Sequence, residues 1–173
     1  IAHFKAPIYS AETATRYQVP QYGWTLIGNL LRPKSRGRVL LTGADPRDPV
    51  RIEPNMLSDP DDLKTAIACV ELCREIGNAS PLRAFTKREV MPGNLNGAEL
   101  ERFVRDAASS SAHQTGTAKM GSDALSVVDA QLKVHGVEGL RIADASVMPR
   151  ITTGNTMAPC VLIGERAGAL ICS

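Results

Sequence analysis

The chain has 173 residues, of which 43% are hydrophobic and 22% are charged, and its net charge is +2. This composition indicates a globular protein of one or two folding units and excludes a disordered chain. The small charge gives no strong field toward nucleic acid or an anionic membrane, and no run reaches the roughly 18 apolar residues that span a bilayer. We therefore expect a soluble protein without nucleic-acid or membrane partners, with the cytoplasm as its simplest compartment.

The first readable elements follow a mixed N-terminal stretch of about thirty residues. Residues 39–42 and 50–52 are apolar enough to form short strands. Between them, the dipeptides Asp45-Pro46 and Asp48-Pro49 are turn signals. The pattern predicts a hairpin or meander in an antiparallel sheet.

A helix is predicted from Pro60 to Gly77. Asp59 suits the N-cap, Pro60 suits the first helical position, and the acidic residues after it favour the positive end of the helix dipole. Gly77 offers a left-handed stop. Capping explains the acidic start, so we expect no metal site there. The apolar residues recur at helical spacing: Leu63, Ile67, Val70, Cys73 and Ile76.

A second helix is predicted after Asn96. Asn96 and Glu99 have the spacing of a capping box, in which each side chain bonds the other residue's backbone N–H. The apolar face that follows runs to about residue 108 and leads the chain directly to His113.

Four cysteines are present, and none of them forms a C-x-x-C pair. Metal clusters need denser cysteine and histidine spacing, and free cysteine commonly packs as a small hydrophobe. We interpret the cysteines as packing residues and predict no metal site. They are Cys69, Cys73, Cys160 and Cys172.

His113 lies in the segment SSSAHQTGTAKMG, residues 109–121. A histidine with an ordinary pKa near ~6.5 can serve as a proton acceptor at neutral pH. The alternative is a structural histidine in a core or loop, which is how we interpret His3 and His135. A further alternative is a hydrolase using a serine of residues 109–111, although the sequence has no G-x-S-x-G turn to expose it.

The last third of the chain predicts a short buried strand over residues 140–143 and an apolar helix over residues 158–171. Pro159 fits the first turn of that helix, so the helix would begin near Asn155 and Thr156. Asn155 could cap this helix or supply its amide to a site. Asp144, after the strand, could be a turn residue or a ligand-contacting one.

These segments together resemble the C-terminal signature of the glucose–methanol–choline flavin oxidoreductases. The matching blocks occur in that family's order: HQTGTAKMG at 113–121, GLRIADASVMP at 139–149, GNTMAP at 154–159 and IGERA at 163–167. Upstream, PKSRGRV at 33–39 and LSDPDDL at 57–63 resemble the family's substrate domain. Four linked blocks are a far more specific signal than any one of them.

The resemblance implies an α+β and α/β architecture. Residues 1–108 would form part of a substrate-binding domain, with helices on an antiparallel sheet. Residues 109–173 would complete an FAD-binding α/β domain and carry the active site. The family's Gly-rich pyrophosphate turn is absent from this sequence. We therefore expect the chain to be a fragment whose partner is the N-terminal FAD-binding portion of the same protein.

The resemblance also implies residue roles in the oxidation of an alcohol. His113 would accept the hydroxyl proton while the α-hydride passes to flavin N5, and Asn155 would hydrogen-bond the substrate oxygen. Asp144 and Ala145 would approach the ribityl and pyrophosphate part of FAD. Asn155 and Thr156, at the helix start, would place N–H groups near the flavin N1 locus.

Two departures from the family pattern leave the substrate open. Gln114 follows the histidine where many members have proline, and Asn155 stands where some members have histidine. The sequence therefore does not identify the alcohol, the electron acceptor or the oligomeric state. The main alternative function is a non-enzymatic binding or structural module that keeps the family's C-terminal fold without flavin.

Overall fold

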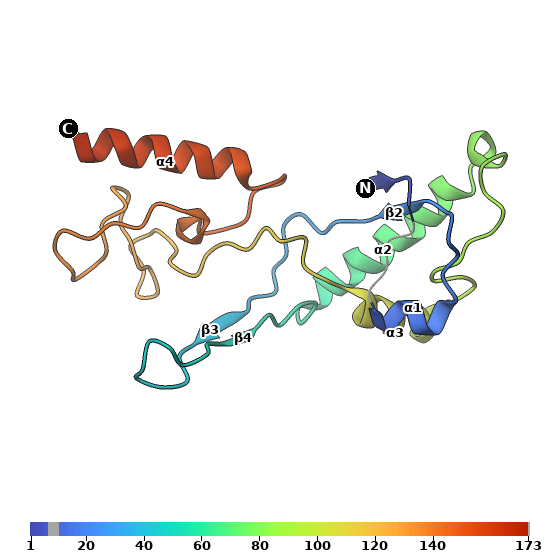
Figure 1. The fold of residues 1–173 in the computed structure, drawn as a ribbon, viewed down its shortest axis with the longest axis horizontal. Helices are drawn as coiled ribbons and strands as arrows, with labels where there is room; N and C mark the ends of the chain where they lie inside the picture. The colour runs from blue at the N-terminus through green and yellow to red at the C-terminus, as the bar shows by residue number, and fades with distance from the viewer. Residues whose placement is uncertain (7–10, 173) are drawn as a thin grey trace. The chain divides into compact units, whose positions relative to one another are not determined.

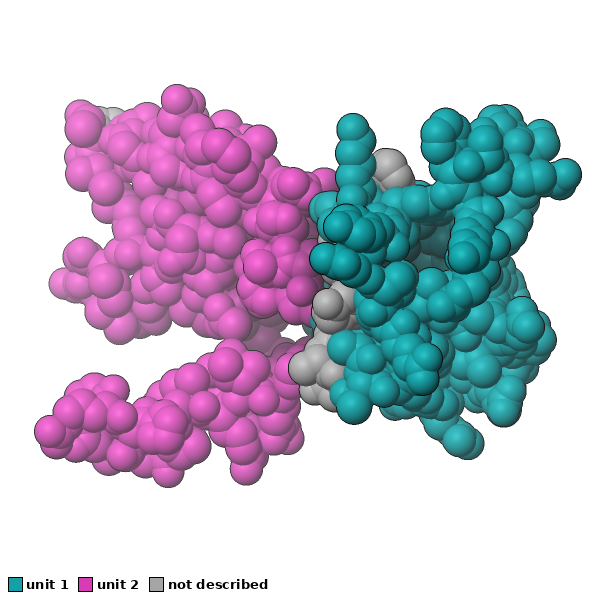
Figure 2. All heavy atoms as spheres, turned by 45° about the vertical axis from the view of Figure 1, so that its right-hand side comes forward, with its two compact units in different colours: residues 1–36, 55–109 teal, residues 37–54, 110–173 magenta. Residues whose placement is uncertain are grey.

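The computed structural model of the chain describes residues 1–6 and 11–172. The predicted domain ranges also include residues 7–10 and Ser173, which lie outside the described residues. The chain forms two compact units, coloured separately in Figure 2. The first combines residues 1–36 with 55–109, and the second combines residues 37–54 with 110–173.

The first unit is mainly helical, with one small antiparallel sheet. Strands β1 (Ala2–Phe4) and β2 (Thr25–Ile27) pair antiparallel. The helices, labelled in Figure 1 apart from the short 3₁₀ turn η1, are α1 (Ala11–Tyr17), α2 (Pro60–Gly77), η1 (Ser80–Leu82) and α3 (Gly97–Ala107).

Helix α2 begins where its capping signals predict. Asp59 is the N-cap, and its carboxylate accepts the Asp61 N–H at 2.9 Å, with Pro60 at the start of the first turn. The predicted left-handed stop at Gly77 is wrong. Gly77 is the last helical residue, and Asn78 caps the end with φ −96°. Its side-chain amide and its backbone N–H both donate to Arg74 O, which satisfies that carbonyl without a left-handed residue.

Helix α3 packs on α2 around the core of the first unit. The buried residues of this core are Leu57, Leu63, Leu100 and Val104. Asn96 is the N-cap of α3, but the predicted capping box is wrong in its side-chain part. The Asn96 amide donates to Asn94 O at 2.9 Å instead, and the helix start depends on backbone bonds to Asn96 O.

A buried carboxylate joins α2 to the segment that precedes the hairpin. Asp62 is 2% exposed and accepts the Lys34 N–H at 2.9 Å, the Ser35 N–H at 2.7 Å and the Ser35 hydroxyl at 2.5 Å. Ser35 Oγ in turn accepts the Asp59 N–H at 3.1 Å. Ser35 thus connects the N-cap of α2 with the first turn of the helix.

The predicted hairpin is confirmed in the second unit. Strands β3 (Arg38–Leu40) and β4 (Arg51–Glu53) pair antiparallel, with Val39 opposite Ile52. In the connecting turn the Asp48 N–H donates to Asp45 O at 2.9 Å. The residue before β3 is Gly37. A Cβ at this position would lie 2.5 Å from Glu53 O, which is too close for any other residue.

The remainder of the second unit is a loop-rich body with helix α4 (Met157–Cys172) and the short 3₁₀ turn η2 (Ala145–Val147). Isolated β-bridges, rather than strands, hold its loops together. The buried residues of its core are Val128, Leu132, Val147 and Ala167. With helices and small antiparallel sheets, the α+β fold class is confirmed.

The predicted buried strand over residues 140–143 is wrong. Leu140 is 49% exposed, and Arg141 forms one isolated bridge, with Lys133. The segment bonds the stretch on the other side of its own turn and forms no ladder, and Ile142 packs only partly buried against the core of the second unit. The predicted apolar helix over residues 158–171 is confirmed as α4, although many of its apolar side chains are exposed. Among the described residues Ala167 is its one buried residue, while Val161 and Leu162 are more than half exposed.

We searched the described residues for membrane-spanning helices and for clusters of metal-binding side chains. No helix within residues 1–6 and 11–172 is long and apolar enough to cross a membrane. The same residues contain no group of three or more His, Cys, Asp or Glu side chains that could hold a metal ion.

Cys69, Cys73 and Cys160 are half-buried, and burial raises the pKa of the Cys73 thiol.

Candidate active site

The loop that follows His113 makes backbone hydrogen bonds to the 3₁₀ turn η2. The Ala118 N–H donates to Ser146 O at 3.0 Å and the Met120 N–H to Val147 O at 2.8 Å. Gly116 has φ +90°, and a Cβ there would lie 3.3 Å from Met148 O. Glycine allows both the left-handed backbone and this approach. These contacts fix the loop that begins at His113 against the segment that begins at Asp144.

Thr156 connects His113 to the start of α4. Thr156 is 7% exposed, and its Oγ1 lies 3.0 Å from His113 Nδ1. Thr156 O accepts the Cys160 N–H at 3.0 Å, which makes Thr156 the N-cap of the helix. The ring of His113 is half-buried, and its Nε2 has no hydrogen-bond partner among the described residues. One nitrogen is therefore held by the protein and the other is left open.

Asn155 lies next to this pair and is exposed. Its side chain makes no hydrogen bond to any residue that the structure describes, so its amide donors and acceptor are open to a ligand. The predicted cap bond from Asn155 to α4 is accordingly absent from the described contacts. The structure thus brings His113, Asn155 and Thr156 together at the N-terminus, or head, of α4.

Asp144 is the N-cap of η2 and is exposed. Its carboxylate accepts the Ser146 N–H at 2.8 Å, and hydrogen bonds from Ser146 lower its pKa below the ordinary value. This is the turn role that the sequence left open beside a cofactor role. Ala145, next to it, is half-buried. Because η2 contacts α4, both residues belong to the same body as Thr156.

The head of α4 can stabilise negative charge. The first N–H groups of a helix lack intrahelical partners, and the helix dipole places partial positive charge there. Together with the Asn155 amide, these donors suit an electron-rich carbonyl or an anionic ring. The surrounding side chains are small or apolar: Gly154, Met157, Ala158 and Pro159. This donor set fits a flavin ring, which needs donors at one edge and apolar contacts on its faces.

The contacts of two residues, Thr156 and His135, were not foreseen from the sequence. The Thr156 hydroxyl, which the sequence did not place, holds His113. One local feature bears on it: Pro159, at the third helical position, has no N–H, which removes one of the two backbone donors that an N-cap hydroxyl commonly accepts. His135, interpreted as structural, has its Nε2 3.0 Å from Gly121 O and its backbone N–H bonded to Val127 O.

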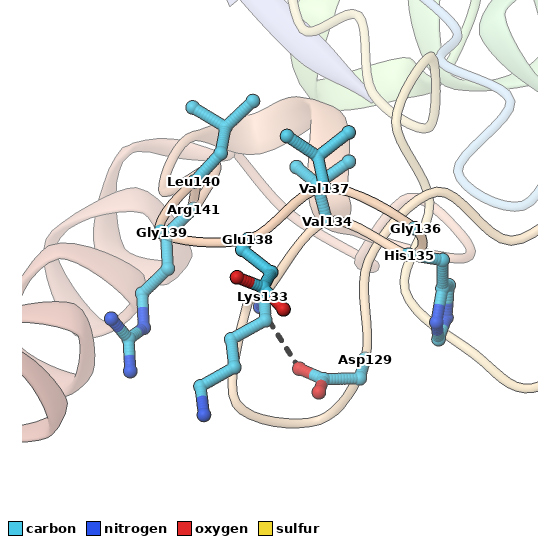
Figure 3. Close-up of a pocket in the computed structure, with 10 residues that line it drawn as sticks. All are labelled: Asp129, Lys133, Val134, His135, Gly136, Val137, Glu138, Gly139, Leu140 and Arg141. Carbon is cyan, nitrogen blue, oxygen red and sulfur yellow. Dashed lines mark hydrogen bonds between the residues drawn. The ribbon is translucent and has the colours of Figure 1, made fainter.

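A separate hollow lies under the turn that follows His135. Its volume is about 680 Å³, and none of the candidate site residues lines it. In Figure 3 Val134, Val137 and Leu140 point to one side of this turn, while Lys133 and Asp129 lie on the other, joined through the Lys133 backbone. The polar groups are used to shape the turn, so we assign this hollow no chemistry.

Comparison with known proteins decides the family. A family model described as GMC oxidoreductase matches residues 33–164. The chain belongs to the GMC oxidoreductase family. The alcohol dehydrogenase [acceptor] of Pseudomonas putida is 43% identical over 152 residues, which is 87% of this chain and 28% of that protein. The mitochondrial choline dehydrogenase of Mus musculus is 44% identical over 145 residues, 82% of this chain and 24% of that protein.

Solved structures agree with the GMC assignment. The pyridoxine 4-oxidase from Mesorbium loti has a TM-score of 0.77 and 33% identity, covering 80% of this chain and 28% of that one. The formate oxidase of Aspergillus oryzae RIB40, whose structure concerns FAD modification, has a TM-score of 0.73 and 29% identity over 82% of this chain and 26% of that one. This GMC chain thus spans about a quarter of its relatives' length, in their C-terminal part.

Proposed function

We propose that this chain carries the proton acceptor and the substrate-orienting amide of an FAD-dependent alcohol oxidoreductase. The observation that carries the proposal is the head of α4. There Thr156 holds one nitrogen of His113, the other nitrogen is open, and the amide of the adjacent Asn155 has no partner among the described residues. The membership of the GMC family supports it. In this proposal residues 1–108 belong to a substrate-binding domain and residues 109–173 complete the FAD-binding domain.

His113 acts on the hydroxyl proton of the substrate. A neutral alcohol is a poor hydride donor, whereas an alcohol that is losing its hydroxyl proton has electron density to release from its carbinol carbon. General-base assistance of this kind is typically worth about 10²- to 10⁴-fold in rate. FAD, when bound, supplies the acceptor for the two electrons that leave the carbinol carbon.

Asn155 donates a hydrogen bond to the substrate oxygen. The bond orients the alcohol toward His113 and strengthens as negative charge develops on that oxygen. Asp144, Ala145, Asn155 and Thr156 are the residues that we assign to the cofactor. Asp144 and Ala145 would contact its ribityl and pyrophosphate part, and the N–H groups at the head of α4 would stabilise its electron-rich edge.

A visible absorption spectrum of the complete gene product that contains this chain tests the proposal. We expect bound flavin, and we expect anaerobic addition of one member of a panel of primary alcohols and polyols to bleach it. A folded protein that carries no flavin would instead support the non-enzymatic module. A flavoprotein that no alcohol bleaches would contradict the substrate class.

Replacing Asn155 by alanine should slow alcohol-driven bleaching by about 10- to 100-fold, the loss expected for one hydrogen bond to a developing charge. Asn155→Asp keeps the size but removes the donors, so it should be equally slow. Some members of the family have histidine at this position, so Asn155→His should retain much of the rate. A lower melting temperature with an unchanged rate in Asn155→Ala would show that Asn155 acts on the helix alone.

A further inference from the structure

The hydrogen bond between His113 and Thr156 decides which nitrogen of the histidine is available. Thr156 Oγ1 lies 3.0 Å from His113 Nδ1, and Thr156 is 7% exposed, so water does not compete freely for this oxygen. A neutral imidazole carries its proton on one nitrogen only. If the hydroxyl donates to Nδ1, the ring proton is on Nε2, and if Nδ1–H donates to the hydroxyl, Nε2 has the free lone pair.

The local sequence leaves the Thr156 oxygen free to accept. An N-cap threonine commonly accepts the N–H of the second or third helical residue, and among the described contacts the second, Ala158, makes no such bond to Thr156. The third helical residue is therefore the remaining backbone donor. In α4 that residue is Pro159, which has no N–H. The Thr156 oxygen therefore has no backbone donor among the described residues, and His113 Nδ1 lies within hydrogen-bond distance of it.

We propose that Thr156 is a positioning residue whose hydroxyl accepts the Nδ1 proton of His113, so that Nε2 is unprotonated and receives the substrate's proton. The inference rests on the proposed function, because only a base needs a free Nε2. The same bond also persists when the His113 ring is protonated on both nitrogens. When Nε2 gains a proton, Nδ1–H continues to donate to the same oxygen, and the bond becomes charge-assisted without any rotation of Thr156.

His135 provides an internal comparison for this inference. Its Nε2 lies 3.0 Å from the carbonyl oxygen of Gly121, which can only accept. In the neutral ring the proton of His135 is therefore on Nε2, the opposite of the arrangement proposed for His113. The two histidines should give opposite signatures in one protein.

Nitrogen NMR of the histidine-labelled holoenzyme, in the complete gene product, tests the proposal without any turnover. We would assign His113 by its loss in His113→Gln and record spectra near ~pH 8.5, about two units above the ordinary histidine pKa. The expected result is a protonated Nδ1 for His113 and a protonated Nε2 for His135. A protonated Nε2 on His113 in the unmodified holoenzyme would overturn the proposal.

Two Thr156 variants connect the tautomer to the reaction. Thr156→Val keeps the shape and removes the hydroxyl, so we expect mixed His113 tautomers and about 10- to 100-fold slower anaerobic flavin bleaching by alcohol, with flavin content kept. Thr156→Ser should restore the Nδ1–H tautomer and most of the rate. A valine variant with unchanged tautomer and rate would refute the positioning role. If instead His113→Gln were bleached at the full rate, the proposed function would fail, while the spectra would still decide the tautomer.

Discussion

Replacing His113 by alanine in the complete gene product is expected to slow anaerobic bleaching of the flavin by alcohol by about 10²- to 10⁴-fold, the range of general-base assistance. The physical reason is that Thr156 holds His113 Nδ1 at the start of α4, while His113 Nε2 has no hydrogen-bond partner among the described residues and can accept a proton. The measurement is the bleaching rate constant at saturating alcohol in a stopped-flow instrument. Flavin content and melting temperature are recorded on the same samples.

Two further variants separate the chemistry at His113 from its structural contact. His113→Gln can still bond Thr156 but cannot accept the substrate's proton at neutral pH, so it should be as slow as alanine. His135→Ala removes a loop histidine that bonds Gly121 O, and it should leave the bleaching rate near that of the unmodified protein. A fast His113→Gln variant would show that the base is elsewhere.

The second large effect is on stability, at Asp62. Asp62→Ala should lower the free energy of unfolding by about 3 kcal/mol, because three hydrogen bonds to a buried carboxylate are lost together. The neighbouring Asp61 is the matched control. Its carboxylate pairs with Lys34 at an exposed position, so Asp61→Asn should change stability much less. Equal losses in thermal unfolding for the two variants would contradict the role of Asp62.

The Asp62 contribution should also depend on pH. Burial alone would raise the pKa of Asp62, but the hydrogen bonds from Ser35 and from the Lys34 backbone outweigh it and hold the pKa below its ordinary value. A group with a lowered folded-state pKa stabilises the fold fully above its unfolded pKa of ~3.9, and the contribution is lost as pH falls through the folded pKa. The difference between Asp62→Ala and the unmodified protein should therefore be constant near neutral pH and shrink below about pH 4.

The elements that the sequence predicts well are those defined by neighbouring residues. Asp59 and Pro60 mark the start of α2 because capping involves residues two or three positions apart. The Asp-Pro pairs mark the turn between β3 and β4 for the same reason. The failures at Gly77 and Asn96 show the limit of such signals, since near each position an asparagine side-chain amide donates to a nearby carbonyl instead of making the predicted contact.

What the sequence could not show are contacts between distant residues. Asp62 was explained by the helix dipole, yet its main partners are 27 and 28 residues away. The bond from Thr156 to His113 spans 43 residues. Residues 140–143 have the composition of a buried strand, but whether a strand forms depends on a neighbour that composition does not reveal. The site residues came from the family pattern, and their arrangement came from the structure.

The most direct test of the central claim uses the substrate rather than a variant. The claim is that the alcohol is oxidised at its carbinol carbon at the head of α4. The rate constant for anaerobic flavin bleaching should be compared for one alcohol with hydrogen and with deuterium on that carbon, in the complete gene product. We expect several-fold slower bleaching by the deuterated alcohol. Equal rates for the two alcohols, or a flavin that neither of them bleaches, would contradict it.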